Sequence, residues 1–308
     1  WVKCMLGTEI KQQFPETIVK ENEKLSHYTY TKTGGPADAL VFPKTKDEVA
    51  AIVAWVNEKQ IPLTVLGNSS NVIIKDGGIR GIVMILTEMN HMEVKRHRLI
   101  VQSGARLIDA SRMALAERLS GLEFACGIPG SVGGAVYMNA GAYDGEVEEV
   151  IESVVVITRE GKIKNYEKNE LEFSYRHSKL QETNEIVLEV VFHLEKGKQE
   201  TIKARMDDLT ALRESKQPLE YPSCGSVFKR PTGYFTGKLI QEAGLQGLIW
   251  GGAQVSMKHA GFIVNINSAT ATDYIELIAH IKEVIMEHYG VPLETEVRII
   301  GEDTVGSV

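Results

Sequence analysis

Two glycine-rich loops have the composition to bind a phosphate-containing ligand. Gly127–Gly134 holds four glycines, one proline and one serine, and a second polar turn follows at Asn139–Tyr143. Because glycine allows positive φ angles and close approach to the backbone, such a run can direct its N–H groups at an anion. The run is long enough to follow a dinucleotide diphosphate. Gly67–Asn71 is a second candidate cradle, and an ordinary surface turn is the alternative interpretation of either loop alone.

A thiol and a hydroxyl stand close together in Tyr221–Pro231, where Cys224 and Ser226 flank Gly225. The thiol would need a nearby histidine or helix N-terminus to form a reactive thiolate. The sequence indicates neither, so we do not expect Cys224 to be catalytic. Ser226 has two interpretations: a turn hydroxyl, or a proton donor in an enzyme that strongly polarises its surroundings.

Arg176 is the most distinctive cation of the middle of the chain. It follows Phe173-Ser174-Tyr175, and in an extended segment its side chain points away from both aromatic residues. Its guanidinium either forms a surface or interdomain salt bridge or grips a carboxylate at two points.

A second charged stretch lies near the end of the chain. Strand alternation over residues 293–299 places Glu294, Glu296 and Arg298 on one face and apolar residues on the other. A solvated polar face is the alternative to a functional one.

Motifs of several other classes are missing. No G-x-G-x-x-G fingerprint follows a first strand, and no Walker A, H-E-x-x-H or G-x-S-x-G pattern is present. If a dinucleotide binds, it therefore does so on a scaffold other than the Rossmann fold. The three cysteines have no CxxC spacing, so we expect neither a disulfide framework nor a metal site.

The composition and charge of the chain limit the classes of partner that we expect. The 308 residues are 43% hydrophobic and 24% charged, and the net charge is −7 without a long basic run, so we expect no nucleic acid partner. No apolar run is long enough to span a membrane, and the first residues lack a secretory signal, so we expect a cytoplasmic protein. An anionic small molecule is compatible with this charge, because the local charge decides its binding.

Periodic hydrophobic patterns supply the elements that must position these loops. Residues 46–59 are a predicted amphipathic helix, introduced by a capping box at Thr45 and Glu48. Predicted helices also cover residues 105–119, 234–243 and 273–289, and another has Ile202, Met206 and Leu209 on one face before Pro218. Predicted strands cover residues 61–66, 72–74, 81–86, 99–103, 150–158, 162–166, 186–194 and 293–300. The sequence pattern changes near residue 200, where we expect a domain boundary, and we expect a weaker boundary near residue 66.

These stretches together resemble the UDP-N-acetylenolpyruvoylglucosamine reductases, which are also called UDP-N-acetylmuramate dehydrogenases. The similarity runs from about Tyr28 to Gly301, and the motifs stand in the family's order. They are Gly67–Asn71, Gly127–Gly134, Asn139–Tyr143, Ser174-Tyr175-Arg176, Gly225-Ser226-Val227-Phe228 and Leu293–Arg298.

The resemblance implies an α+β fold with a two-subdomain FAD-binding region of the vanillyl-alcohol-oxidase (PCMH) type, followed by an α+β substrate-binding domain. We assign residues 1–66 and 67–199 to the FAD-binding subdomains and 200–308 to the substrate domain. It also implies that NADPH reduces bound FAD, and that reduced FAD delivers hydride to the vinyl carbon of an enolpyruvyl UDP-sugar in peptidoglycan precursor synthesis. We expect small-molecule partners only, and a monomer.

The resemblance also assigns site residues. Arg176 and Glu296 are expected to stabilise an enolate-like intermediate, and Ser226 is expected to protonate the carbon next to the vinyl terminus. The physical logic agrees, because a guanidinium stabilises charge that develops on the adjacent carboxylate. The expected FAD contacts are Gly67, Asn68, Ser69, Ser70, Asn71, Gly127, Pro129, Gly130, Ser131, Gly133, Gly134, Asn139, Gly141, Arg213 and Arg298. The expected substrate contacts are Tyr175, Lys216, Lys229, Arg230 and His259.

The chain departs from the longer family members in three places. The stretch between Arg176 and Ser226 is too short for their tyrosine-bearing loop over the substrate, which indicates the short subclass. Arg230 stands where the longer forms carry asparagine, and Asp144 replaces a glycine, for which we expect a slightly strained turn. The alternatives are a flavoenzyme of the same fold with another substrate, and a nucleotide-binding module without catalysis. The combination of Arg176, Ser226 and Glu296 argues against both.

Overall fold

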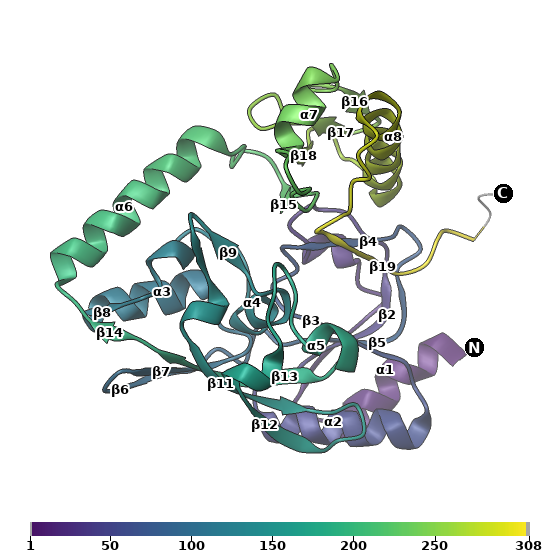
Figure 1. Cartoon of the computed structure of the whole chain (residues 1–308). Coiled ribbons are helices and arrows are strands. Elements are labelled where there is room, and N and C mark those ends of the chain that lie inside the picture. The colour runs from purple at the N-terminus through teal and green to yellow at the C-terminus, as the bar shows by residue number, and fades with distance from the viewer. Residues whose placement is uncertain (1, 306–308) are drawn as a thin grey trace. The chain divides into compact units, whose positions relative to one another are not determined.

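The computed structural model describes residues 2–305, which form two compact units (Figure 1). The first unit contains the chain up to Glu21 together with Asp38–Asn68 and Gly81–Arg213. The second contains Asn22–Ala37, Ser69–Arg80 and the chain from Glu214 onward. Both units are discontinuous in sequence, whereas the predicted segments 1–66, 67–199 and 200–308 are continuous. The predicted bounds of the two FAD-binding subdomains and the substrate domain stay a prediction.

A four-stranded sheet and two helices open the fold. The strand order is β1 (Ile18–Glu21), β2 (Ala37–Phe42), β5 (Ile79–Ile85), β3 (Leu63–Leu66), and the helices are α1 (Val2–Gln13) and α2 (Lys46–Lys59). β1 is antiparallel to β2, and β3 is parallel to β5. The predicted apolar face of α2 is buried in a core with β2 and β5. The structure thus confirms the helix over residues 46–59.

The N-terminus of α2 differs in one detail from the predicted capping box. The Thr45 hydroxyl accepts a hydrogen bond from the Glu48 N–H at 3.1 Å, as expected of an N-cap. The Glu48 carboxylate instead accepts from the Lys44 N–H at 3.2 Å and the Thr17 hydroxyl at 3.1 Å. The box is therefore half formed, because donors outside the helix occupy the glutamate.

A five-stranded antiparallel sheet completes the first unit, with the strand order β12 (Ile163–Glu167), β11 (Ile151–Ile157), β13 (Ile186–His193), β7 (Arg98–Gln102), β6 (Met92–Lys95). Alternate residues of β11 face opposite sides. Val154 and Val156 pack in a core with α3 (Leu107–Ala116) and α4 (Val132–Met138), which lie together over the sheet (Figure 1). Ile157 packs in the core that contains α2. The sheet therefore has helices on both faces.

The second unit is built on a four-stranded sheet and two helices. The strand order is β15 (Ser223–Ser226), β18 (Phe262–Asn265), β17 (Ala253–Val255), β16 (Ile249–Trp250), and the helices are α7 (Thr236–Glu242) and α8 (Ala271–Tyr289). The predicted stripe along α8, from Tyr274 to Ile285, is buried in this core. A separate parallel pair joins β4 (Val72–Ile74) to β19 (Arg298–Ile300).

The predicted strand over residues 293–300 is wrong except for its last three residues. Residues 293–297 form one isolated bridge, between Thr295 and Phe228, before the chain bends and pairs with β4. The bend carries the backbone from the end of β15 to a different sheet, which a straight strand does not allow. Strand alternation therefore does not set the faces of Glu294 and Glu296.

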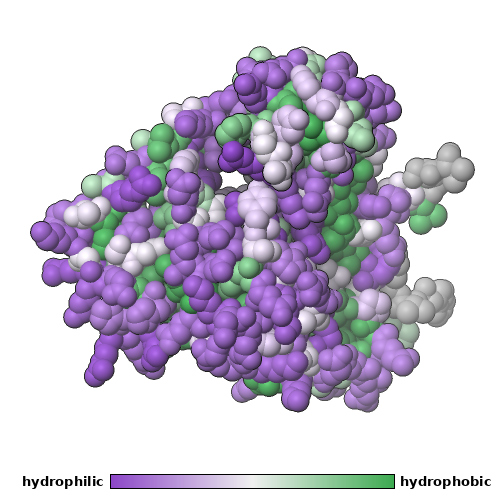
Figure 2. Space-filling model, viewed as in Figure 1, coloured by the Kyte–Doolittle hydropathy of each residue, from purple (hydrophilic) through white to green (hydrophobic). Residues whose placement is uncertain are grey.

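The remaining elements are short, apart from one long helix. They are β8 (Leu119–Ser120), β9 (Gly141–Ala142), β10 (Gly145–Glu146), α5 (Leu180–Thr183), β14 (Glu195–Lys196) and α6 (Gln199–Lys216), with 3-10 turns at Leu25–His27, Glu123–Ala125, Val147–Glu149 and Lys168–Leu171. Among the described residues, no helix has the length and apolar character needed to cross a bilayer. Hydrophilic side chains dominate the face shown in Figure 2.

Asp76 ties the β4 segment to the start of α8. Its carboxylate accepts hydrogen bonds from the N–H groups of Ala271 and Thr272, both at 2.9 Å, and from the Thr272 hydroxyl at 2.6 Å. These bonds satisfy helix N-terminal donors and place negative charge at the positive end of the helix dipole. This carboxylate thus joins the β4 segment to α8, which are about 195 positions apart in the sequence.

We expect Asp76→Ala to lower the stability of the second unit by about 1–2 kcal/mol, in the range of a lost helix cap. Amide hydrogen exchange in the first turn of α8 should accelerate, and the thermal midpoint should fall. Asp208→Ala, at an exposed aspartate of α6, is the control and should leave both unchanged. Unchanged exchange in Asp76→Ala would show that the α8 terminus does not depend on this carboxylate.

Candidate functional site

Each of the two units carries part of the predicted site. The first unit holds Gly67, Asn68, Gly127, Pro129, Gly130, Ser131, Gly133, Gly134, Asn139, Gly141, Tyr175, Arg176 and Arg213. The second holds Ser69, Ser70, Asn71, Lys216, Ser226, Lys229, Arg230, His259, Glu296 and Arg298. The three expected catalytic residues are divided between them, Arg176 in the first unit and Ser226 and Glu296 in the second.

Arg176 occupies the corner of a tight turn rather than an extended segment. The N–H groups of Ser174 and His177 each donate to the other residue's carbonyl at 3.1 Å, which leaves Tyr175 and Arg176 at the corner. Arg176 has a φ of +51°, a left-handed conformation that costs a non-glycine residue about 1 kcal/mol or more. The predicted extended geometry is therefore wrong, and the guanidinium lies over the Tyr175 ring, 5.1 Å from its centre.

The Arg176 guanidinium is held by backbone carbonyls of the Asn139–Tyr143 turn. It donates to the carbonyls of Asn139, at 3.3 Å, and Gly141, at 2.9 Å. Two fixed acceptors constrain both the position and the plane of the group. The structure thus joins Arg176 with two residues predicted to contact the cofactor.

The two predicted phosphate-binding loops meet in the first unit. A Cβ atom on Gly67 would overlap the Ser131 hydroxyl, so only glycine fits there. Ser131 caps α4, where its hydroxyl accepts from the Gly134 N–H at 3.2 Å. A Cβ atom on Gly127 would likewise overlap the Arg213 side chain. Burial lowers the pKa of the Arg213 guanidinium, and nearby Tyr143 and Cys126 oppose that shift.

Two buried hydroxyls fit a bound cofactor at these loops. Ser69, with a φ of +53°, and Ser103 are 8% and 2% exposed. Among the described residues, neither hydroxyl has a hydrogen-bond partner. Burying an unpaired hydroxyl costs about 1–3 kcal/mol, which a polar ligand atom would offset. The sequence analysis did not identify Ser103. The Gly133 N–H donates to the Ser103 carbonyl at 2.8 Å, and no spacing rule connects residues 103 and 133 in the sequence.

The Asp144 substitution lies in a two-residue turn between β9 and β10. Tyr143 has a φ of +51° and Asp144 a φ of +66°, the signs that a type I′ hairpin turn requires. The structure confirms the strained turn expected at Asp144. The tyrosine at the first corner is strained as well, which the sequence analysis did not predict.

Ser226 and Glu296 lie on neighbouring backbone segments of the second unit. The Val227 carbonyl, next to Ser226, accepts from the Glu296 N–H at 2.8 Å and the Val297 N–H at 3.4 Å. Gly225 has a φ of +75° and lies at the register shift within β15, between Ser223 and Ser226, and Ser226 is exposed. These backbone contacts bring the expected proton donor and carboxylate to one place.

Asn71 connects Glu296 to the second predicted loop. Its side-chain amide donates to the Glu296 carbonyl at 3.2 Å, and its own carbonyl accepts from the Arg298 N–H at 3.1 Å. The predicted cofactor contacts Asn71 and Arg298 therefore adjoin the glutamate that is expected to be catalytic.

The predicted substrate residues of the second unit have different surroundings. Lys229 pairs with Glu294 at 2.9 Å, and the Arg230 guanidinium lies 4.0 Å from the centre of the Phe235 ring. The Gly261 N–H donates to His259 Nδ1 at 3.0 Å, so the neutral ring carries its proton on Nε2. Burial lowers the pKa of His259 and favours that neutral form. Lys216 is exposed at the end of α6.

The two described cysteine side chains differ in exposure, Cys126 being half-buried and Cys224 buried. Cys126 lies 3.6 Å from the Met206 carbonyl and 3.8 Å from the Thr210 hydroxyl. Cys224 is 3% exposed, and burial raises its pKa to about 12. The Cys4 side chain lies outside the described residues. In the described part of the chain, no group of three His, Cys, Asp or Glu residues is placed to hold a metal ion.

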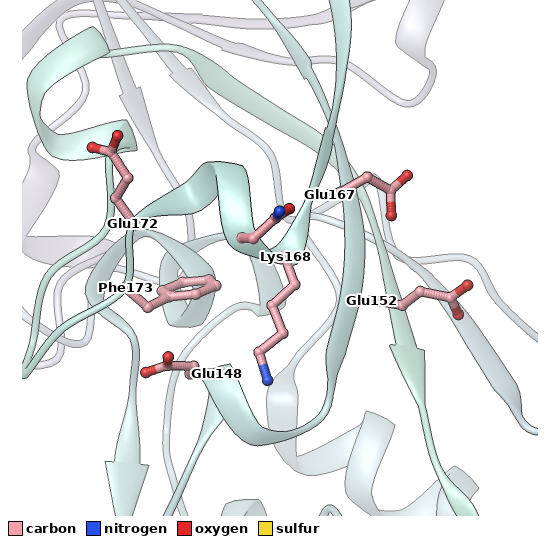
Figure 3. Close-up of a pocket in the computed structure, with 7 residues that line it drawn as sticks. Glu148, Glu152, Glu167, Lys168, Glu172 and Phe173 are labelled. Atoms are coloured by element: carbon pink, nitrogen blue, oxygen red, sulfur yellow. The ribbon is translucent and has the colours of Figure 1, made fainter.

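An acidic pocket of about 460 Å³ lies in the first unit, and none of the predicted site residues lines it. It is lined by Glu148, Glu152, Glu167, Lys168, Asn169, Glu172 and Phe173 (Figure 3). The negative charge of its four carboxylates repels an anionic ligand. The pocket therefore does not fit a diphosphate.

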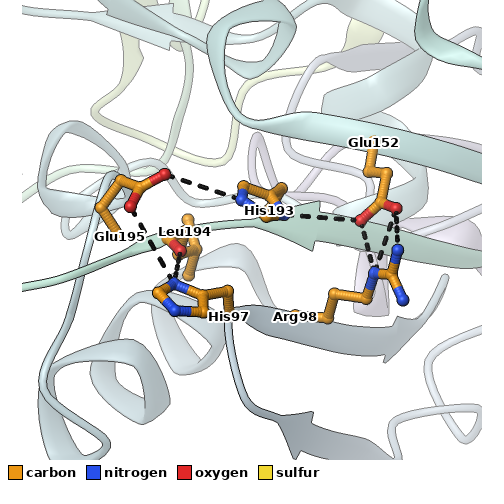
Figure 4. A network of polar contacts seen from close by, with 6 residues as sticks. All are labelled: His97, Arg98, Glu152, His193, Leu194 and Glu195. Atoms are coloured by element: carbon orange, nitrogen blue, oxygen red, sulfur yellow. Dashed lines mark hydrogen bonds and ion pairs between the residues drawn. The ribbon is translucent and has the colours of Figure 1, made fainter.

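Glu152 on the wall of this pocket belongs to a surface ion-pair network (Figure 4). Arg98 donates to its carboxylate at 2.6–3.0 Å, and this hydrogen bonding lowers the pKa of Glu152. His193 lies 3.8 Å from Glu152 and 3.6 Å from Glu195. Exposed pairs of this kind contribute little to stability, and the network holds no predicted site residue.

Comparisons with known proteins cover both parts of the chain. A family model described as FAD binding domain matches residues 37–167, and one described as UDP-N-acetylenolpyruvoylglucosamine reductase, C-terminal domain, matches residues 217–300. The UDP-N-acetylenolpyruvoylglucosamine reductase of Pediococcus pentosaceus is 57% identical over 97% of this chain and 100% of its own length. The protein of the same name from Enterococcus faecalis is 63% identical over 98% and 99%.

A solved structure agrees with these relatives. The crystal structure of UDP-N-acetylenolpyruvylglucosamine reductase from Thermus caldophilus superposes with a TM-score of 0.79 and 35% sequence identity. The match covers 92% of this chain and 98% of that one. The similarity therefore extends across both units.

The burial of Cys224 leads to a test of the second unit. Because its pKa is raised to about 12, the thiol stays protonated at pH 8, and its burial excludes reagents. We expect iodoacetamide at pH 8 to leave Cys224 unmodified in the native protein and to modify it in urea, as measured by peptide mass spectrometry. Rapid native modification of Cys224 would contradict the buried placement of β15.

Proposed function

This chain belongs to the UDP-N-acetylenolpyruvoylglucosamine reductase family, and from that premise we propose that it reduces the enolpyruvyl ether of UDP-N-acetylglucosamine enolpyruvate to UDP-N-acetylmuramate with NADPH. It is an FAD-dependent oxidoreductase with a PCMH-type FAD-binding region and a family-specific C-terminal domain. Similarity to named relatives over nearly the whole length carries the proposal.

FAD, when bound, supplies the hydride transfer between NADPH and the substrate. We assign its binding to the loops Gly67–Asn71 and Gly127–Gly134, to Asn139 and Gly141, and to Arg213 and Arg298. The buried hydroxyls of Ser69, in the second unit, and of Ser103, in the first, support this assignment, because each would gain a hydrogen bond from a polar ligand atom.

We assign Arg176 to the carboxylate of the enolpyruvyl group. Addition of hydride to the vinyl terminus pushes the electron pair of the double bond toward the carbon that carries this carboxylate. A guanidinium in a fixed orientation stabilises that charge without reorganising during the reaction. Its hydrogen bonds to the Asn139 and Gly141 carbonyls support such preorganisation.

We assign Ser226 to proton delivery and Glu296 to stabilisation of the same intermediate. The Ser226 O–H bond breaks as the new C–H bond forms at the carbon next to the carboxylate, and solvent returns a proton to the oxygen. A serine is a weak acid, but it can protonate a more basic carbanion-like carbon. The hydrogen bond from Glu296 N–H to the Val227 carbonyl supports a shared role.

The other polar residues are proposed to bind the UDP-sugar. Lys216, Lys229 and Arg230 supply positive charge for its phosphates, and Tyr175 forms part of the site wall. His259 offers an Nε2–H donor that stays neutral near pH 7, since burial lowers its pKa. The short subclass, a monomeric state and a cytoplasmic location are part of the same proposal.

An anaerobic titration tests the reaction. NADPH is expected to bleach the flavin absorbance of the purified holoenzyme, and one equivalent of the enolpyruvyl sugar nucleotide is expected to restore it with formation of UDP-N-acetylmuramate. UDP-N-acetylglucosamine, which lacks the vinyl group, is the control and should leave the flavin bleached. Failure of the enolpyruvyl compound to restore the absorbance would reject the proposed reaction.

Ser226→Ala tests the proton donor. The variant should keep FAD and its reduction by NADPH, while product formation falls by about 10²-fold or more, the usual loss on removing a general acid. Ser223→Ala, a serine of the same strand, is the matched control and should keep wild-type turnover. Normal product formation by Ser226→Ala would remove Ser226 from this role.

A further inference from the structure

The turn that carries Arg176 is held by two side-chain amides on neighbouring segments. Gln181, in α5, donates from Nε2 to the Arg176 carbonyl at 2.9 Å and to the Tyr137 carbonyl at 3.0 Å. The sequence analysis did not identify Gln181. Its amide links the strained residue directly to the last turn of α4.

Asn139 holds the other side of the turn. Its Nδ2 donates to the Ser174 carbonyl at 2.9 Å, and its Oδ1 accepts from the Glu148 N–H at 3.0 Å. The residue is 0% exposed and caps α4 with a φ of +45°. Both polar atoms of the Asn139 side chain are therefore engaged in holding protein segments together.

The two amides therefore fix both carbonyls that bracket the corner of the turn, at Ser174 and at Arg176. Both connect to residues 137–139 at the C-terminal end of α4, whose Val132, Ala135 and Val136 are packed in the core. The guanidinium rests on the carbonyls of Asn139 and Gly141, in the same segment. Backbone and side chain of Arg176 thus share one rigid support.

We propose that Gln181 and Asn139 are positioning residues that keep Arg176 in its left-handed conformation and present its guanidinium in one orientation before substrate binds. The inference rests on the proposed role of Arg176. Loss of the Gln181 amide removes its hydrogen bond to the Arg176 carbonyl, and loss of the Asn139 amide removes one of the two donors to the Ser174 carbonyl, so the turn can relax. A displacement of about 1 Å at a reacting group can cost a large factor in rate, up to about 10²-fold.

Gln181→Met tests the inference, because methionine keeps the length of the side chain and removes the donors. In single-turnover experiments on the FAD-loaded enzyme, reoxidation of the flavin by the enolpyruvyl substrate should slow by about tenfold, within the range for misplaced groups. Flavin reduction by NADPH should stay within about twofold of wild type, since that step does not use Arg176. The matched control is Gln199→Met, which removes a hydrogen bond from a glutamine amide to the Leu115 carbonyl and should leave both rates unchanged.

A double-mutant cycle with Arg176→Lys separates positioning from general destabilisation. If Gln181 acts through Arg176, the double variant reoxidises no more slowly than Arg176→Lys alone. The inference is overturned if the rate losses of the two single variants multiply in the double variant. It is also overturned if Gln181→Met reoxidises at the wild-type rate while Arg176→Lys reoxidises slowly. Both outcomes leave the proposed function intact. A wild-type rate in Arg176→Lys overturns the catalytic assignment of Arg176 itself. If Gln181→Met does not fold, Gln181→Asn, whose amide is too short to span both carbonyls, takes its place with the same outcomes.

Discussion

The left-handed backbone of Arg176 is the constraint on which the first unit's part of the site depends. A non-glycine residue adopts this conformation only where its surroundings compensate for the strain. Here the compensation comes from the end of α4, whose carbonyls hold the guanidinium and whose Asn139 side chain holds the turn. The same segment begins at Ser131, beside the Gly67 loop. One short, buried helix therefore connects the expected cofactor loops to the expected catalytic cation.

In the second unit, hydrogen bonds to the backbone hold the expected site residues in place. Ser226 and Glu296 are 70 positions apart, and neither lies within a long regular element. The Val227 carbonyl and the Asn71 amide hold the Glu296 segment in place. In both units, the side chains expected to be functional stand on irregular backbone that is fixed by a few specific hydrogen bonds. Such sites are easily disturbed by the loss of a single donor.

The sequence predicted those elements whose pattern is local. The helix over 46–59 and the strand over 72–74 match α2 and β4, because continuous or amphipathic apolar runs determine them. β15 was not predicted, since its residues Ser-Cys-Gly-Ser have no strand pattern and only pairing with β18 defines it. The strand assigned to residues 293–300 failed for the converse reason: an alternating pattern was present, but the chain bends to join another sheet. The site motifs were identified through resemblance, whereas the contacts of Gln181 and Ser103 depend on tertiary structure and leave no signature in residue spacing.

The central claim is that Arg176, Ser226 and Glu296 act on one enolpyruvyl group. A crystal structure of the complex with oxidised FAD and the enolpyruvyl sugar nucleotide, without NADPH, tests it most directly, because no turnover occurs. The account predicts that the Arg176 guanidinium lies within hydrogen-bond distance of the substrate carboxylate, with Ser226 Oγ and Glu296 facing the adjacent carbon. A substrate bound with its carboxylate directed away from Arg176, or with Ser226 out of reach of that carbon, would contradict it.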